Sequence, residues 1–444
     1  MADAGGRAAA KTLAVLFAIN TMNFFDRQIL GAVGEPVRRE WQLSDGALGL
    51  LGTAFTLLYA VVGVPLGRLA DRVSRTRILA AGVFVWSVLT AASGMARSFW
   101  QLFVVRLGVG VGEATCAPAA TSLIGDLFPP ARRSRALAVF MVGLPIGTAL
   151  SYLVSSYVAQ SWGWRSAFYI AGLPGVLCAL AVLFVPEPAR GRAEAHTVGE
   201  RQREGSPYKR VLTIPTMWWI ILSGALHNFN MYALGAFLSP FLIRYHGTGI
   251  GRAGLVLTLT YGLAGAPGLL MGGLAGDAIF RRRRDGRLLV SVAALALSVP
   301  LIYLALRVPA GEVTRFAVLL GLACAAMYVY YAIVYSAIQD VIEPSLRGTA
   351  MALYFFAMYV LGASLGPAAT GFVSDYFTKE AARSAGVAVL SGAALEPFRA
   401  QGLHSAMYLV PALAAILSVV LWAASRTVTR DMERLQEWMR AESA

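Results

Sequence analysis

Charged residues are scarce in this chain. Of its 444 residues, 14% are charged and 57% are hydrophobic, whereas soluble domains carry about 25% charged residues. The mean hydropathy is +0.62. A soluble protein of this length would need more charge on its surface, so the composition excludes that class. It indicates an all-α protein that crosses a membrane many times.

Cysteine is scarce too. The three cysteines, Cys116, Cys178 and Cys324, lie in apolar stretches, and they have neither the spacing of metal ligands nor that of a disulfide framework. The sequence also lacks the G-x-x-x-x-G-K-[ST] motif, whose loop cradles the phosphates of a nucleotide. This absence argues against a nucleotide-driven pump. We predict neither a metal nor a cofactor.

The net charge of +14 has two interpretations. In a soluble protein it would indicate binding to nucleic acid. Here the arginines cluster in short loops between apolar runs, and such loops stay on the cytoplasmic side, next to anionic lipid headgroups. We favour the second interpretation and expect contacts with membrane lipids and none with nucleic acid.

Twelve apolar runs are long enough to span a bilayer, which takes about 20 residues. An even number of spans puts both termini on one side. The arginine-rich loops at Arg72–Arg77, Arg132–Arg135 and Arg281–Arg284 put that side in the cytoplasm, so we predict an inner-membrane protein with both termini cytoplasmic. The runs are 12–34, 46–67, 77–96, 99–125, 135–160, 165–186, 215–243, 251–276, 288–306, 315–339, 348–374 and 403–425.

The two halves of the chain resemble each other. Asp, Pro, Arg and Ala recur in register in Asp126–Ala136 and Asp340–Ala350, and Trp164–Tyr169 is echoed by Leu403–Tyr408. Such repeats are typical of secondary transporters. The tail is expected either to lie on the membrane surface or to pack under a bundle. We predict an N-terminal six-helix bundle (1–186), a cytoplasmic linker (187–214), a C-terminal six-helix bundle (215–426) and a cytoplasmic amphipathic tail (427–444).

The first run carries Asp26 and Arg27 side by side within an otherwise apolar stretch. A charge near the bilayer centre is costly, and it survives only where it faces a protein interior or a watery cavity. In the fourth run, Arg106 and Glu113 share one helix face with Gly110. We expect the four charged residues to form one buried cluster.

Two roles are open for this cluster. In the first, a carboxylate exchanges protons as the cavity opens to each side, with Glu113 as the first candidate and Asp26 as the second. Arg27 or Arg106 then pairs with that carboxylate or binds an anionic headgroup. In the second, static ion pairs lock the helices together. We favour the first role, because isolated buried ion pairs contribute little net stability.

The pattern G-x-L-A-D-R-x-x-R-x-R runs from Gly67 to Arg77, at the cytoplasmic end of the second run. Asp71 can accept hydrogen bonds from a helix N-terminus or an arginine, so Gly67, Asp71, Arg72 and Arg75 are candidates for a conformational latch. Alternatively, this loop only fixes the topology. The pattern resembles the signature loop of the major facilitator superfamily, and the resemblance covers the whole chain. It implies two six-helix bundles that rock around a central site.

A closer resemblance concerns three stretches. NFFDRQIL in the first run, RLGVGVGEATCAPAATSLIGDLFPPARRSRA in the fourth, and the loop IQDVIEPSLRGTA resemble the spinster family, in a bacterial form. Known members move sphingosine 1-phosphate or lysophospholipids, and some couple this movement to protons. The resemblance implies an amphipathic or lipid substrate, with protons as further partners.

Aromatic and amide residues gather in the second half. Tyr328, Tyr331 and Tyr335 fall on one helix face by their spacing, and Gln339 extends it. Such a wall suits an amphipathic lipid, but tyrosine and asparagine also join membrane helices without binding a ligand. Both interpretations stay open. Including Asn23 of the first run, the candidate cavity residues are Asn23, His227, Asn228, Asn230, Tyr328, Tyr331, Tyr335, Tyr354 and Tyr359.

We predict a monomeric secondary transporter that works by alternating access, is coupled to protons and moves a lysophospholipid or sphingosine-phosphate-like anion. A proton-coupled exporter of drugs or small organic anions is the alternative within the same class. A membrane enzyme acting on lipids is a different class, and the four histidines are scattered with no H-E-x-x-H motif. A sensor that keeps a transporter fold but moves no substrate is a third possibility.

Overall fold

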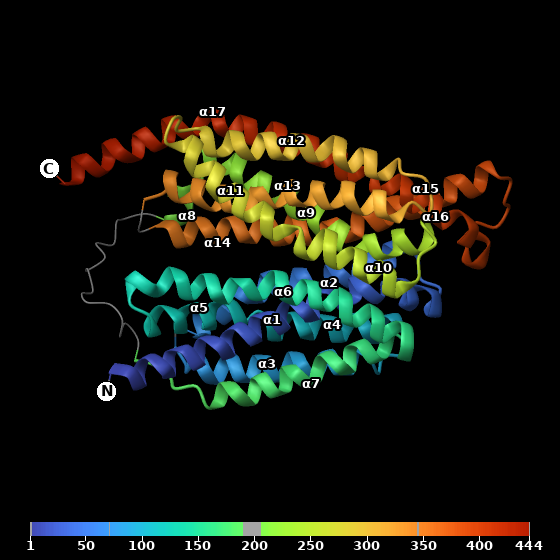
Figure 1. Ribbon diagram of the computed structural model, residues 1–444, viewed down its shortest axis with the longest axis horizontal. Helices are drawn as coiled ribbons and strands as arrows, with labels where there is room; N and C mark the ends of the chain where they lie inside the picture. Colours follow the sequence, from blue (N-terminus) through green and yellow to red (C-terminus); the bar gives the residue numbers. More distant parts are fainter. Residues whose placement is uncertain (1, 71, 190–205, 344–345, 444) are drawn as a thin grey trace. The chain divides into compact units, whose positions relative to one another are not determined.

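The computed structural model describes residues 2–70, 72–189, 206–343 and 346–443 (Figure 1). The regular structure in these ranges is helical, as predicted. The α-helices of the first half are α1 (Ala2–Trp41), α2 (Asp45–Ala70), α3 (Arg75–Ser93), α4 (Phe99–Glu113), α5 (Cys116–Leu127), α6 (Pro130–Trp162) and α7 (Trp164–Leu183). Those of the second half are α8 (Pro207–Leu212), α9 (Pro215–Arg244), α10 (Ile250–Leu257), α11 (Gly265–Phe280), α12 (Gly286–Leu306), α13 (Val313–Val341), α14 (Arg347–Ala357), α15 (Leu365–Ser384), α16 (Arg399–Met407) and α17 (Leu409–Ser443).

Shorter helices of other types interrupt the second half. Two π-helices, η1 (Thr258–Leu263) and η3 (Met358–Ala363), lie inside the predicted runs 251–276 and 348–374, and the 3-10 helix η4 (Gly392–Phe398) precedes α16. In the first half, the predicted run 99–125 is divided into α4 and α5. Pro118 has no N–H for the carbonyl of Ala114, and the Thr115 hydroxyl donates to the Gly112 carbonyl at 2.8 Å. The helix therefore breaks directly after Glu113.

The helices group into two units. Unit 1 comprises Met1–Gly199 and Thr248–Thr258, and unit 2 comprises Glu200–Gly247 and Leu259–Ala444. Within unit 1, α10 packs against α6, where a Cβ at Gly254 would lie 2.6 Å from the carbonyl oxygen of Tyr152. The predicted run 251–276 is thus shared between the two units.

In the described part of the chain, eleven helical stretches are long and apolar enough to cross a membrane. The predicted run 215–243 is not among them, although it forms α9, a helix of 30 residues. His227, Asn228 and Asn230 lower the mean hydropathy of this helix. At about 1.5 Å per residue it still exceeds the 30 Å of a bilayer core. The predicted all-helical polytopic fold is confirmed.

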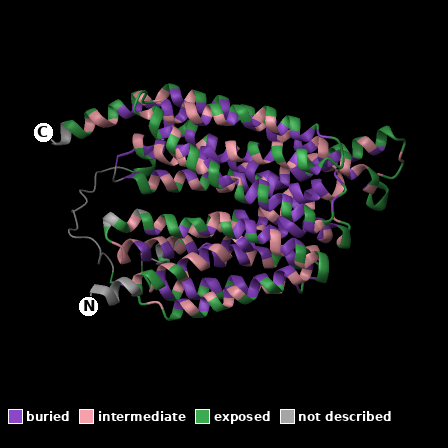
Figure 2. Ribbon diagram, in the orientation of Figure 1, coloured by how far each residue is buried: buried purple, intermediate pink, exposed green. Residues whose placement is uncertain are grey.

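Buried and exposed residues both occur along the helices of each unit (Figure 2), and large apolar side chains are found in both classes. In unit 1, a buried cluster includes Trp86, Val109 and Phe140. On the outside, large side chains such as Leu173 of α7 and Val419 of α17 are 66% and 63% exposed. Outward apolar side chains suit a lipid environment, because lipid tails are as apolar as leucine.

Candidate functional site

Asp26 and Arg27 lie in the middle of α1, and both side chains are buried in unit 1. The Nε atom of Arg27 donates to Oε2 of Glu113 at 2.8 Å, and the side chain of Glu113 is fully buried. An ion pair therefore joins α1 to the last residue of α4. Asn23 lies one turn before Arg27 and is also buried next to Glu113.

The other two charges of the cluster do not form a side-chain ion pair. Nη1 of Arg106 donates to the backbone carbonyl of Asp26 at 3.3 Å. The Asp26 carboxylate accepts from the hydroxyl of Thr90, on α3, at 3.3 Å. Among the residues that the structure describes, Asp26 Oδ1 and Glu113 Oε1 have no hydrogen-bond partner. The structure thus brings the four predicted residues together, with one acceptor position open on each carboxylate.

Two glycines of α4 bring neighbouring helices close to the cluster. A Cβ atom at Gly110 would lie 2.7 Å from the carbonyl oxygen of Phe55 on α2, and one at Gly112 would lie 2.8 Å from the Cβ of Trp86 on α3. Glycine lets backbones approach closely in membrane proteins. The two glycines therefore place α2 and α3 against the helix that carries Arg106 and Glu113.

Aromatic rings surround the two arginines. The guanidinium of Arg27 lies 4.2 Å from the ring centroid of Tyr59 and 4.9 Å from that of Phe24, and the guanidinium of Arg106 lies 5.0 Å from that of Phe55. Aromatic faces attract cations, most strongly where water is excluded. The sequence interpretation missed these rings. The spacing of four between Phe55 and Tyr59 was the signal that could have placed them on one face.

Unit 2 has a different interior, centred on His227 of α9. The imidazole is fully buried, stacks on the ring of Tyr330 with centroids 4.1 Å apart, and meets the edge of Tyr331 at 4.7 Å. The hydroxyl of Tyr330 bonds those of Ser223 at 2.8 Å and Tyr354 at 3.1 Å. Within the described ranges, neither ring nitrogen of His227 has a hydrogen-bond partner. The sequence interpretation did not include Tyr330, which lies off the predicted tyrosine face.

The three tyrosines of the predicted helix face lie next to one another. The ring of Tyr331 is 5.8 Å from that of Tyr328 and 6.0 Å from that of Tyr335, which is itself 5.9 Å from the ring of Tyr354. Tyr331 and Tyr335 keep part of their surface exposed. These two rings are therefore the accessible part of the face.

The other candidate cavity residues of unit 2 have other contacts. Asn228 donates to the Gly224 carbonyl of its own helix at 3.2 Å. The ring of Tyr359 lies 6.5 Å from that of Tyr232. Asn230 is fully buried, and neither polar atom of its amide has a partner in the described part of the chain.

The predicted latch residue Arg75 begins α3 and is buried. Its guanidinium donates to Asp126, to Glu187 at 2.8 Å and to the Pro188 carbonyl at 2.8 Å. Glu187 also accepts from the backbone N–H of Thr76 at 2.8 Å. Burial raises the pKa of Glu187, but these hydrogen bonds outweigh it and lower the pKa to about 2. Arg75 thus fastens the segment after α7 to the start of α3.

The remaining latch candidates lie nearby in the chain. Gly67 is in the last turn of α2, and Arg72 is exposed. Asp71 lies outside the described residues. Unit 2 has a counterpart of the arginine site, because Arg287 donates to Asp340 at 2.5 Å and to Asp277 at 2.7 Å. Asp126 and Asp340 are the equivalent aspartates of the sequence repeat, so each repeat binds an arginine at this place.

One stretch of unit 2, Gly362–Gly366, has the form G-x-S-x-G, which surrounds the nucleophile of many esterases. That nucleophile sits on a sharp strand-to-helix turn. Ser364 instead lies between η3 and α15 and donates to the Tyr359 carbonyl at 2.9 Å. A Cβ at Gly362 would lie 2.5 Å from the carbonyl oxygen of Ala225 on α9. The glycines therefore allow close helix packing.

Among the described residues, no group of three His, Cys, Asp or Glu could hold a metal ion.

Long apolar helices with an ion pair buried inside one unit define a multi-pass membrane protein with a charged interior. Residues 16–367 match the family model of the Major Facilitator Superfamily. The chain belongs to this superfamily, which indicates a transporter and not an enzyme.

Two relatives and one solved structure indicate to which members of the superfamily this chain is similar. An MFS-type efflux pump of Mycolicibacterium smegmatis is 32% identical over 96% of this chain and 95% of its own length. A sphingosine-1-phosphate transporter of Xenopus tropicalis is 29% identical over 85% of this chain and 76% of its own length. The crystal structure of a bacterial homologue of the human lysosomal transporter spinster, in an inward-facing and unoccupied conformation, has a TM-score of 0.86 and 27% identity. The match covers 96% of this chain and 98% of that one. The predicted resemblance to the spinster family is confirmed.

Proposed function

We propose that this protein is a secondary transporter that works by alternating access and moves an amphipathic anion together with protons. The observation that carries the proposal is the buried ion pair of Arg27 and Glu113, 2.8 Å apart inside a membrane-spanning helix pair. A static pair of this kind contributes little net stability. Its presence therefore favours a role in which the pair opens.

The charges of the cluster account for coupling between a proton and an anion. Two arginines and two carboxylates sum to zero. A proton on Glu113 would leave the cluster with one positive charge and release Arg27 from its partner. A substrate headgroup with one negative charge would then restore neutrality. A buried net charge is costly, so proton and anion favour each other's binding.

Glu113 is the first candidate for the proton carrier and Asp26 the second. Glu113 pairs with Arg27 and sits at the break between α4 and α5. Asp26 contacts the neutral hydroxyl of Thr90. We propose Arg27 and Arg106 as the groups that bind the anionic headgroup or hold the carboxylates.

A lysophospholipid or a sphingosine-phosphate-like molecule fits these groups as a substrate class. Its phosphate suits the arginines of unit 1, because arginine and phosphate form strong charge-assisted hydrogen bonds. The similarity to a sphingosine-1-phosphate transporter supports this class. Asn23, His227 and Asn230 are proposed as further cavity residues.

We propose the inner membrane as the location, with both termini cytoplasmic, and a monomer as the working form. The arginine-rich loops at Arg72–Arg77 and Arg281–Arg284 support this orientation. Arg75, with Asp126 and Glu187, is proposed as part of a cytoplasmic latch that closes in one state of the transport cycle.

The test is transport in proteoliposomes that contain a pH-sensitive dye. Lysophospholipids and sphingosine 1-phosphate are added with and without an imposed pH gradient. We expect proton flux that depends on the added lipid in the wild type, and no such flux in Glu113→Gln. Asp26→Asn tests the second candidate. Glu40→Gln is the matched control, because Glu40 pairs with Arg165 at 2.7 Å at the partly exposed end of α1.

Lipid movement without proton flux, unchanged in Glu113→Gln and Asp26→Asn, would make the protein a facilitator and leave the cluster with a structural role. Equal loss of proton flux in Glu40→Gln would show that breaking any ion pair abolishes transport, so that the effect is not specific to Glu113.

A proton-coupled exporter of drugs or small organic anions is the second candidate function. The similarity to a mycobacterial efflux pump over 96% of this chain favours it. Movement of cationic dyes or small organic anions, with no movement of any lysophospholipid in the same liposomes, would decide for this function.

A further inference from the structure

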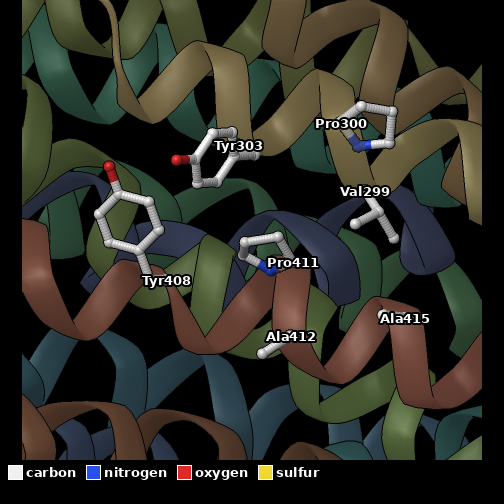
Figure 3. Close-up of a pocket in the computed structure, with 7 residues that line it drawn as sticks. All are labelled: Val299, Pro300, Tyr303, Tyr408, Pro411, Ala412 and Ala415. Atoms are coloured by element: carbon white, nitrogen blue, oxygen red, sulfur yellow. The ribbon is translucent and has the colours of Figure 1, made fainter.

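An open groove of about 380 Å³ lies on unit 2 where α12 and α17 pack together (Figure 3). Pro300 of α12 and Pro411, Ala412 and Ala415 of α17 form its apolar part. Both helices belong to stretches that can cross a membrane. The volume falls in the range of about 300–1,000 Å³ found for small-molecule sites. The groove therefore offers room for part of a lipid molecule.

Two tyrosines line one end of the groove (Figure 3). The rings of Tyr303 and Tyr408 lie there, 5.8 Å apart. Arg307 follows directly after the end of α12, is exposed, and donates to the hydroxyl of Tyr303 at 3.1 Å. Within the described part of the chain, Arg307 forms no ion pair. A cation and two phenols thus meet at the end of a membrane span, where tyrosine is typical of the interface between lipid and water.

The corresponding helix pair of unit 1 is closely packed. Tyr169 and Tyr408 hold the same place in the sequence repeat, and Gly172 corresponds to Pro411. A Cβ at Gly94 would lie 2.7 Å from the ring of Tyr169, and one at Gly172 would lie 2.8 Å from the Cβ of Ala91. Glycines bring α3 and α7 together at the place where prolines and small side chains leave a groove between α12 and α17.

We propose that this groove binds one acyl chain of an anionic phospholipid of the surrounding membrane, with the lipid phosphate on Arg307 and on the hydroxyls of Tyr303 and Tyr408. Charge complementarity selects this occupant. Arginine and phosphate form strong charge-assisted hydrogen bonds, and the exposed arginine has no carboxylate partner among the described residues. A zwitterionic lipid carries its own cation and gains less from Arg307. The site is independent of the proposed transport function.

The test is native mass spectrometry of the full-length protein in detergent, titrated with dioleoylphosphatidylglycerol or dioleoylphosphatidylcholine. We expect one phosphatidylglycerol to bind more tightly than any phosphatidylcholine. Arg307→Gln should weaken this binding about five-fold, the effect of one basic residue near an anionic lipid. Ala412→Phe should abolish it, because the exposed Ala412 lines the groove and the larger ring fills it.

Two variants serve as matched controls. Arg426→Gln removes another exposed arginine that lies by an aromatic ring of α17, 4.7 Å from the Trp422 centroid. Val419→Phe enlarges an exposed side chain of the same helix. Both variants should still bind one phosphatidylglycerol as tightly as the wild type does.

Three results would overturn the proposal. The first is equal binding of both lipids or equal loss in the controls. The second is glycerol 3-phosphate binding as tightly as the whole lipid, which would assign the site to a free phosphate. The third is a dimer that Ala412→Phe abolishes, which would assign the groove to a second copy of the chain.

Discussion

The interiors of the two units differ in charge. Unit 1 buries two arginines and two carboxylates around the Arg27–Glu113 pair. Unit 2 buries His227 against the rings of Tyr330 and Tyr331. Buried charges in a membrane span are costly and face a cavity or one another, whereas stacked rings combine apolar burial with modest specific attraction. This difference is the reason why we propose charge-dependent chemistry for unit 1 and shape-dependent contact for unit 2.

The arginine sites after the second and eighth predicted runs do not show this difference. Arg75 binds Asp126 in unit 1, and Arg287 binds Asp340 in unit 2. Both aspartates belong to the sequence repeat. The repeat is therefore retained in this architectural contact and has diverged in the interior, where we place the function.

The largest expected effect concerns the ion pair of unit 1. Arg27→Ala or Glu113→Gln alone leaves one buried group without its partner, and we expect each to lower the free energy of unfolding in detergent by about 3–5 kcal/mol. The double variant should cost less than the sum, because it leaves no unpaired charge. Unfolding of the four proteins by denaturant measures the cycle. Additive effects would show that Arg27 and Glu113 do not interact. The contrast between a buried ion pair in unit 1 and stacked rings in unit 2 would then lose its basis.

A second prediction tests whether close helix contact in unit 2 depends on glycine, as it does around Gly110 in unit 1. Gly362→Ala places a Cβ 2.5 Å from the Ala225 carbonyl oxygen, so we expect a loss of about 1–3 kcal/mol in the free energy of unfolding. Gly273→Ala is the control, because a Cβ there meets nothing within 4 Å. It should be neutral or slightly stabilising. Equal losses in both variants would show that the helices at Gly362 have room for a Cβ atom.

The sequence was sufficient to predict the all-helical fold and the gathering of Asp26, Arg27, Arg106 and Glu113. Apolar runs give span positions, and a charge inside a span must face inward. Which arginine pairs with Glu113 could not be predicted. Helix spacing places Arg106 and Glu113 on one face, but the rotation of α1 decides that Glu113 binds Arg27.

Other features depend on contacts between helices that are distant in the sequence. Each of the π-helices η1 and η3 has a wider turn than an α-helix. This turn depends on how the surrounding helices pack, and the composition of the segment does not indicate it. Tyr330 lies off the predicted tyrosine face, so its bonds to Ser223 and Tyr354 follow only from the packing of α13 against α9 and α14.

A third prediction compares the buried arginine site of unit 1 with the exposed contact of unit 2. Glu187→Gln should cost about 1–2 kcal/mol, since Glu187 accepts several hydrogen bonds but is partly exposed. Asp277→Asn, the control, should cost less than about 0.5 kcal/mol, because Asp277 is largely exposed.

The pH dependence gives this prediction its sign. The pKa of Glu187 is about 2 in the folded protein, below its ordinary value of 4.5. A depressed pKa stabilises the fold above pH 4.5, and this contribution is lost as the pH falls towards 2. The difference in unfolding free energy between wild type and Glu187→Gln should therefore shrink between pH 5 and pH 3. A constant difference would mean that the hydrogen bonds to Glu187 do not depend on its charge.

The smallest expected effect concerns the uncharged rings that pack around His227 in unit 2. Tyr330→Phe keeps the ring stacked on His227 and removes the hydroxyl that bonds Ser223 and Tyr354, so we expect a loss of about 1 kcal/mol in the free energy of unfolding. Because no charge is removed, the pH dependence of transport should match that of the wild type, while the preference among substrates of different chain length changes. Transport rates at several pH values, with two chain lengths, measure both. A shifted pH profile would show that unit 2 contributes to proton handling, and the proposed division between proton exchange in unit 1 and chain contact in unit 2 would then fail.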